Sequence, residues 1–183
     1  HSEQKSRCFL TLEEVKKIID LNYRPKNDVK PAFLFCCFSG LRFSDVYKMK
    51  WGEITMSQDG NVQLKTTMKK TGKTIWVPLS DNALRWLPER GDASDDDRVF
   101  ANLPAQASNA DSRLKTLISH AGITKHVTFH VARHTFATLT LQYGADLYTV
   151  SKLLGHSNIR TTQIYAKIVD ESKRKAVNLI PNL

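Results

Sequence analysis

The sequence lacks any apolar run long enough to cross a lipid bilayer, which takes about 20 predominantly apolar residues. It also starts without the basic lead-in and apolar core of a secretory signal peptide. We therefore expect a soluble protein of the cytoplasm that has no membrane partner.

Cysteine is scarce, with three residues in a chain of 183. Cys36 and Cys37 are adjacent inside an apolar run, and an odd count of this kind makes a poor disulfide framework. The pattern indicates reduced thiols in a protein core.

Acidic residues are outnumbered, 18 against 27 basic ones, which gives a net charge of +9 and a pI near 9.5. Such a surface favours a polyanionic partner, and nucleic acid is the usual one. Charge alone does not separate this interpretation from a basic surface without a partner. The length and a hydrophobic content of 41% suit one well-packed domain, residues 1–183.

The patterning predicts an α+β fold that is mainly α-helical, with a small three-stranded antiparallel β-sheet. Thr11 and Glu14 form a capping box ahead of an amphipathic helix. Residues 28–40 are apolar nearly all round, as expected of a buried central helix. The sequence then predicts three β strands, at 52–57, at 62–67 and in the string TIWVPL. Helices are expected to begin near Ser80, Ser108 and His130.

The turn before the third strand is rich in lysine and has no acid between Lys65 and Lys73. A basic hairpin tip is suited to a DNA groove or a row of phosphates. For any single lysine, a solvated turn is the alternative.

Residues 130–168 combine side chains that ordinary packing does not require. His130 and Arg133 share one face of a helix, because they are three residues apart. Asp146 is placed to cap a second helix, His156 follows at its exit, and Tyr165 lies on a third. These elements could bring a cation, two imidazoles and a phenol to one anionic group.

Arg42 follows the central helix and precedes Asp45 by three residues. From these residues alone, a structural salt bridge between the two is the simplest interpretation.

Four strings in this order, SGLRFSDV, KKTGKTIWVPLS, FHVARHTFAT and LLGHSNIRTTQIY, resemble the signature segments of the tyrosine recombinase (phage integrase) family. These segments are most similar to those of integrases of conjugative or mobilisable transposons, and the resemblance covers nearly the whole chain. Four segments in order, with nine residues from His156 to Tyr165, are far more specific than any one of them. The resemblance implies the fold of the family's catalytic domain.

The resemblance also implies two phosphate-binding arginines and a lysine acid. Arg42 and Arg133 would contact the scissile phosphate, where guanidinium forks meet the charge that develops on the non-bridging oxygens. Lys70, seven residues before Val77, would be the mobile hairpin lysine that protonates the leaving 5′-oxygen. Further DNA contacts are expected from Lys69, Lys73, Lys125 and Arg160.

Tyr165 would be the nucleophile. A phenol with a pKa near 10 needs to lose its proton before it attacks. His130 would take or orient that proton, and His156 would donate to a phosphate oxygen. A 3′-phosphotyrosyl product stores the energy of the phosphodiester, so that rejoining needs neither ATP nor metal, and we expect no cofactor.

A zinc site is the alternative interpretation of the histidines in this segment. His130 and His134 are four apart, as in a zinc-binding helix. HVARH lacks the glutamate of the HExxH motif, and Arg133 would bring a positive charge close to the ion. We therefore expect no metal, and we expect His134 to pack or hydrogen-bond in the core.

Three function classes stay open. The first is a site-specific recombinase of a mobile element, monomeric when free and tetrameric on two DNA duplexes. The second is a type IB topoisomerase, and the third is a DNA-binding domain that has lost catalysis. Family members usually carry N-terminal DNA-binding domains, which we expect to be absent from these residues. Residues 170–183 would form a tail that docks on a neighbouring subunit or packs in cis.

Overall fold

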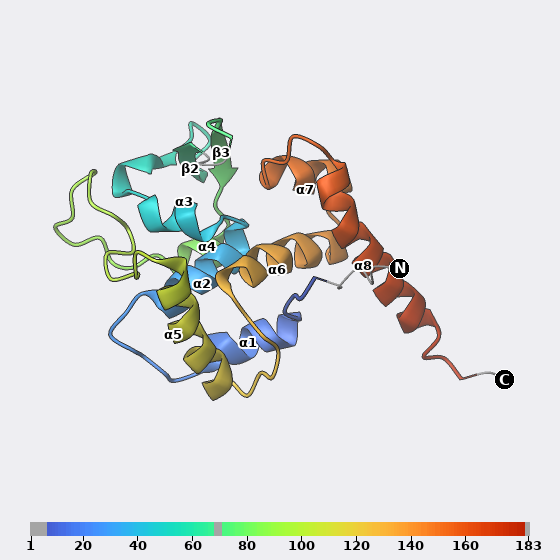
Figure 1. Cartoon of the computed structure of the whole chain (residues 1–183). Helices are drawn as coiled ribbons and strands as arrows, with labels where there is room; N and C mark the ends of the chain where they lie inside the picture. The colour runs from blue at the N-terminus through green and yellow to red at the C-terminus, as the bar shows by residue number, and fades with distance from the viewer. Residues whose placement is uncertain (1–6, 68–70, 182–183) are drawn as a thin grey trace.

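A computed structural model describes residues 7–67 and 71–181. It has the expected α+β architecture, mostly helical with one small antiparallel sheet. Figure 1 shows the sheet on one side of two central helices, α2 (Val29–Ser39) and α6 (Phe129–Gln142). Helices α1 (Leu12–Asp20) and α5 (Ala107–His120) lie on the other side.

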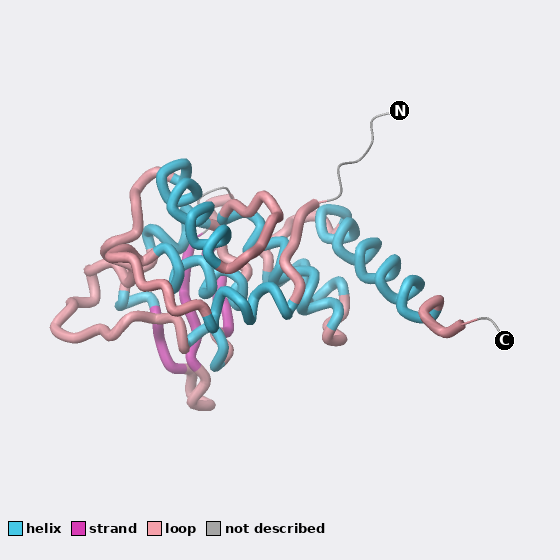
Figure 2. The backbone as a smooth tube through the Cα atoms, turned by 90° about the horizontal axis from the view of Figure 1, so that it is seen from below, coloured by secondary structure: helices cyan, strands magenta, loops and turns pink. Residues whose placement is uncertain are grey.

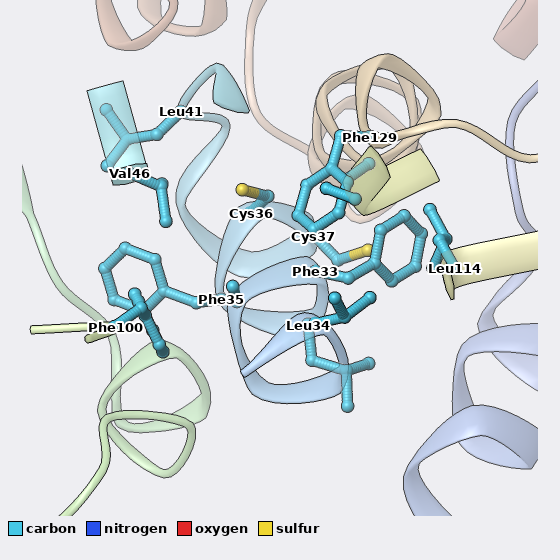
Figure 3. Packing of buried hydrophobic residues seen from close by; sticks show 14 of the residues in the cluster. Phe33, Leu34, Phe35, Cys36, Cys37, Leu41, Val46, Phe100, Leu114 and Phe129 are labelled. Atoms are coloured by element: carbon cyan, nitrogen blue, oxygen red, sulfur yellow. The ribbon is translucent and has the colours of Figure 1, made fainter. Parts of the chain in front are cut away.

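The predicted central helix α2 is buried on nearly every side, and Figure 3 shows its aromatic side chains within the core. Phe33 packs edge-on against Phe129 of α6 with 5.7 Å between ring centroids. Cys36 and Cys37 are buried free thiols, as expected. Helix α1 begins at the predicted capping box, because Thr11 and Glu14 each accept the other's backbone N–H.

The three-stranded meander is confirmed. Helix α3 (Phe43–Lys48) and a short 3₁₀ turn (Trp51–Glu53) lead into β1 (Ile54–Met56), β2 (Val62–Thr67) and β3 (Thr74–Pro78). The strands pair in chain order, with Leu64 of β2 opposite Ile54 and Val77. A short helix α4 (Asp81–Leu84) follows, capped by the Ser80 hydroxyl.

The C-terminal helices form a second, smaller core. Helices α7 (Leu147–Leu153) and α8 (Arg160–Val177) pack on the end of α6 around Ala137, Val150, Leu154 and Tyr165. Asp146 caps α7 as predicted. Helix α8 then projects from the rest of the molecule (Figures 1 and 2), and the chain exposes Val177 at its end and Leu179 and Ile180 just after it.

Among the described helices, none combines the length and the apolar character needed to cross a bilayer.

Candidate active site

The Arg133 side chain joins three parts of the chain. Its Nη1 donates to the Gly40 carbonyl at 2.7 Å, and its Nη2 donates to the Leu154 carbonyl at 2.7 Å. Gly40 ends α2 and Leu154 ends α7, so this one guanidinium holds together the loops that lead to Arg42 and His156. Burial, and then the charge of nearby Arg42, lowers the pKa of Arg133 to about 10, which leaves it charged at neutral pH.

Gly40 is required by this arrangement. Its φ of 74° lies in the left-handed region that favours glycine. A Cβ at this position would also lie 2.5 Å from Cδ1 of Phe136, well inside contact distance. The close packing of α2 against α6 therefore fixes the carbonyl that accepts from Arg133.

Arg42 is half-buried at the N-terminal end of α3, and its Nη1 is fully buried without a hydrogen-bond partner in the described part of the chain. The salt bridge to Asp45 is not found among the described residues, which leaves that interpretation unsupported. A buried guanidinium nitrogen without a partner is costly, so the site is suited to an anion. The charge of Arg42 helps to lower the pKa of Arg133, which indicates that the two guanidinium groups are neighbours.

His156 lies beside Arg133. Its Nε2 is 3.3 Å from Nη2 of Arg133, and its Nδ1 is 2.6 Å from the hydroxyl of Thr162. Thr162 is completely buried in the first turns of α8, three residues before Tyr165. That spacing puts both residues on one helix face, a signal that could have drawn attention to Thr162 in the sequence.

The Tyr165 phenol is buried, with 1% of the residue exposed, and its oxygen lies 2.6 Å from Nδ1 of His134. Burial, and then the neighbouring His130, lowers the pKa of His134 to about 3, so its imidazole is neutral near pH 7 and can accept the phenol proton. His134 thus hydrogen-bonds in the core as expected. That its partner is Tyr165 was not predicted.

His130 keeps an exposed side while its ring packs edge-on against His134, with 4.4 Å between centroids. Desolvation, and then the charges of Arg133, Arg7 and Arg42, lowers the pKa of His130. A neutral imidazole is the form that can accept a proton. The start of its helix is held by Asp111 of α5, which accepts from the backbone N–H of Phe129 at 2.8 Å.

The candidate DNA-contacting residues differ in their surroundings. Lys69 and Lys70 lie outside the described residues. Lys73 and Arg160 are exposed, on the hairpin turn and at the start of α8. The Lys125 ammonium donates to the Phe9 carbonyl and pairs with Glu14 at 2.6 Å, so it has a role within the protein.

Potential metal ligands do not gather in the described part of the chain, where no three histidine, cysteine, aspartate or glutamate side chains come together in a metal-binding group. Nδ1 of His134 is already bonded to Tyr165. The exposed His120 ring stacks on Tyr23, far in sequence from the site.

Several solved structures share this fold. XerA recombinase superposes with a TM-score of 0.73 at 23% identity, covering all of this chain and 67% of that one. XerH recombinase bound to its difH substrate gives 0.72 at 24% identity, covering 88% of this chain and 51% of that one. The Tn1549 transposon integrase in complex with circular intermediate DNA gives 0.64 at 17% identity, covering 90% and 62%. These likenesses confirm the fold of the catalytic domain.

Sequence relatives agree with the fold. Tyrosine recombinase XerA of Thermococcus onnurineus is 32% identical over 175 residues, which are 91% of this chain and 60% of the relative. Tyrosine recombinase XerD of Proteus mirabilis is 32% identical over 182 residues, or 93% and 55%. The chain thus spans less than two thirds of the length of these relatives. The model of the phage integrase family matches residues 8–172, and the chain belongs to that family.

Proposed function

We propose that this chain is the catalytic domain of a site-specific DNA recombinase, which cleaves one DNA strand with Tyr165 and rejoins it through a 3′-phosphotyrosyl intermediate. The observation that carries the proposal is the buried Nη1 of Arg42, near Arg133, which has no hydrogen-bond partner among residues 7–67 and 71–181. A phosphodiester would supply the missing acceptor, and its charge would offset that of two neighbouring cations.

The donor count of Arg133 supports this role. A guanidinium has five N–H groups. Three of these point at Gly40, Leu154 and His156, and the other two have no hydrogen-bond partner among the described residues and are proposed to meet a ligand. Backbone carbonyls therefore fix the orientation of the fork before the phosphate arrives, and such preorganisation is what stabilises a developing charge most effectively.

Tyr165 has to leave His134 before it can attack, because its phenol is buried in the small C-terminal core. We assign that movement to α8, whose contacts lie mainly with the end of α6 and with α7. Neutral His134 or His130 would take the phenol proton. His156, once protonated, would donate to the phosphate, and Lys70 would protonate the leaving oxygen.

The DNA partner is proposed to be a pair of attachment sites on a mobile element. The support is the net charge of +9 and the likeness to the Tn1549 integrase, which is bound to circular intermediate DNA. The sequence relatives named above are Xer recombinases, so the mobile-element role rests on the structural likeness and on the signature strings. Relatives longer than this chain are consistent with a further DNA-binding domain ahead of these residues.

The proposed assembly on DNA is a homo-tetramer formed from free monomers. The apolar segment just after α8 has Leu179 82% and Ile180 74% exposed. An apolar groove of about 1000 Å³ lies between the sheet, α2 and α6 and could receive it in a second copy. The groove is lined in part by Phe38, Val62, Val77, Leu79, Phe136 and Leu139. Removing residues 177–183 should then abolish strand exchange between two sites while cleavage at a single site persists, and equal loss of both would contradict the trans docking.

A duplex nicked next to the cleavage point tests the central proposal, because loss of a short product traps the covalent intermediate. The unmodified chain should form a protein–DNA adduct that resists denaturant, and Tyr165→Phe should form none. Tyr148→Phe is the matched control, because Tyr148 is exposed on α7 and should form the adduct normally.

The same assay separates the alternatives. Adducts on one DNA sequence only support a recombinase. Adducts on any sequence, with relaxation of arbitrary plasmids, would favour a topoisomerase. DNA binding without any adduct would favour a domain that has lost catalysis.

A further inference from the structure

The hydroxyl of Thr162 is a buried partner of His156. Thr162 has no exposed surface, and its Oγ1 lies 2.6 Å from Nδ1 of His156. Arginine can only donate hydrogen bonds. Nε2 of His156, which faces Nη2 of Arg133 at 3.3 Å, must therefore present its lone pair to that contact.

These two contacts together select one tautomer. If Nε2 accepts from Arg133, the proton of the neutral imidazole is on Nδ1, where it is donated to Thr162. A carbon at the hydroxyl position would remove the hydrogen bond that holds the ring against Arg133, so the ring could turn away from Nη2 and populate the other tautomer. The Thr162 hydroxyl is therefore placed to control which nitrogen of His156 faces the arginine pair.

We propose that Thr162 is a positioning residue that holds His156 as its Nδ1–H tautomer and couples the orientation of His156 to helix α8. Thr162 and Tyr165 share one face of α8, so a movement of the helix that releases Tyr165 from His134 also moves the Thr162 hydroxyl. The phosphate-facing imidazole and the nucleophile then respond to the same displacement. The catalytic consequence rests on the proposed function, whereas the tautomer does not.

Nitrogen NMR of the histidine rings tests the tautomer on the free chain, without DNA. His156 should show protonated Nδ1 and unprotonated Nε2, and Thr162→Val should shift it toward the Nε2–H form. Thr162→Ser should keep the unmodified pattern, because it retains the hydroxyl. His120 is an internal reference, since its Nδ1 faces the carbonyl oxygen of Thr116 at 2.8 Å and must donate in every variant.

Adduct formation tests the catalytic consequence. Thr162→Val should slow cleavage by about tenfold or more, since small errors in the placement of a reacting group cost on the order of 10²-fold. Thr162→Ser should recover most of the rate, and DNA affinity should be unchanged in both. Thr161→Val is the matched control, because the neighbouring Thr161 is exposed.

An Nε2–H tautomer in the unmodified chain, or the same tautomer in Thr162→Val, would overturn the proposal even if the chain cleaves DNA. Normal cleavage by Thr162→Val would overturn its catalytic part. If Thr162→Val does not fold, the spectrum of the unmodified chain and the rate of Thr162→Ser still decide it. A chain that shows the Nδ1–H tautomer but forms no adduct would instead contradict the proposed function and leave the tautomer assignment supported.

Discussion

Two regions of the molecule contribute to the site, and they are built differently. The body, formed by α1 to α6 and the sheet, has an extensive core around α2 and holds Arg42 and the start of α6. The C-terminal cluster, formed by α7, α8 and the end of α6, has a small core in which Tyr165 is itself a main component. The arginines that we propose bind phosphate thus belong to the well-packed region, and Tyr165, the proposed nucleophile, belongs to the region with the smaller core.

This difference suits a reaction in which the binding groups are fixed and the nucleophile moves. Regions with few buried apolar contacts open at lower free-energy cost than a main core does. Arg133 is one of the contacts that join the two regions, because it bonds Gly40 of the body and Leu154 of the cluster.

Arg133→Lys should have the largest effect. Lysine keeps the charge but cannot reach two carbonyls and a phosphate with one planar fork. We expect adduct formation to fall by about 10²-fold or more, as for loss of one preorganised donor. Arg113→Lys on α5 is the control for a conservative change on the body and should cleave normally. Near-normal cleavage by Arg133→Lys would show that the fork geometry is not needed.

Gly40→Ala should destabilise the body side of the contact. The positive φ costs about 1–2 kcal/mol for a side chain, and overpacking against Phe136 adds about 1–3 kcal/mol. Gly122→Ala is the matched control, since it has a φ of 71° with nothing within 4 Å of the added Cβ. Urea unfolding should rank the two losses in this order, and equal losses would show that Phe136 moves aside freely.

Acidification should weaken the folded state through His134. Its folded pKa of about 3 is below the ordinary value of 6.5, so the unfolded chain binds a proton that the folded chain does not. The contribution of His134 to the free energy of unfolding should therefore be fully present above pH 6.5 and be lost as the pH falls toward 3. His134→Gln should reduce this decline in urea titrations at pH 7 and pH 5.

His126→Gln, a change at an exposed histidine, is the control for the titration and should leave the decline unchanged. If His134→Gln declines as steeply as the unmodified chain, then His134 is not the group responsible. Because His130 also has a lowered pKa, part of the decline should remain in His134→Gln.

The smallest effects are expected at the periphery. Arg160→Ala should reduce the salt dependence of DNA binding by about one unit of slope if Arg160 contacts a phosphate. Lys125→Ala should change that slope less, because Lys125 is already paired with Glu14, and it should cost below about 1 kcal/mol of stability. If Lys125→Ala changes the slope more than Arg160→Ala does, then Lys125 contacts the DNA.

The helices, the meander and the cluster of charged side chains could be predicted from local patterns. Thr11 and Asp146 cap their helices as the sequence indicates, and the burial of α2 follows from its apolar composition. The residues of the site could be named because the signature strings carry them. The contacts of these residues could not be predicted. Several of them are made with backbone carbonyl groups, whose positions depend on the tertiary structure and not on the residue type.

Three contacts illustrate that limit. Arg133 bonds two carbonyl groups, whose positions are set by the ends of α2 and α7. Arg42 has a buried nitrogen for which the described part of the chain offers no partner, where local spacing suggested a salt bridge to Asp45. Tyr165 bonds His134 because α8 packs across the end of α6, which only the tertiary structure determines.

The residue that becomes attached to DNA can be identified chemically. The trapped adduct would be digested with nuclease and trypsin and examined by mass spectrometry. Cleavage after Arg160 and Lys167 releases the peptide TTQIYAK, in which Tyr165 is the only tyrosine. We predict that this peptide carries the added nucleotide phosphate on Tyr165. An unmodified TTQIYAK peptide together with DNA attached to another residue would contradict the account.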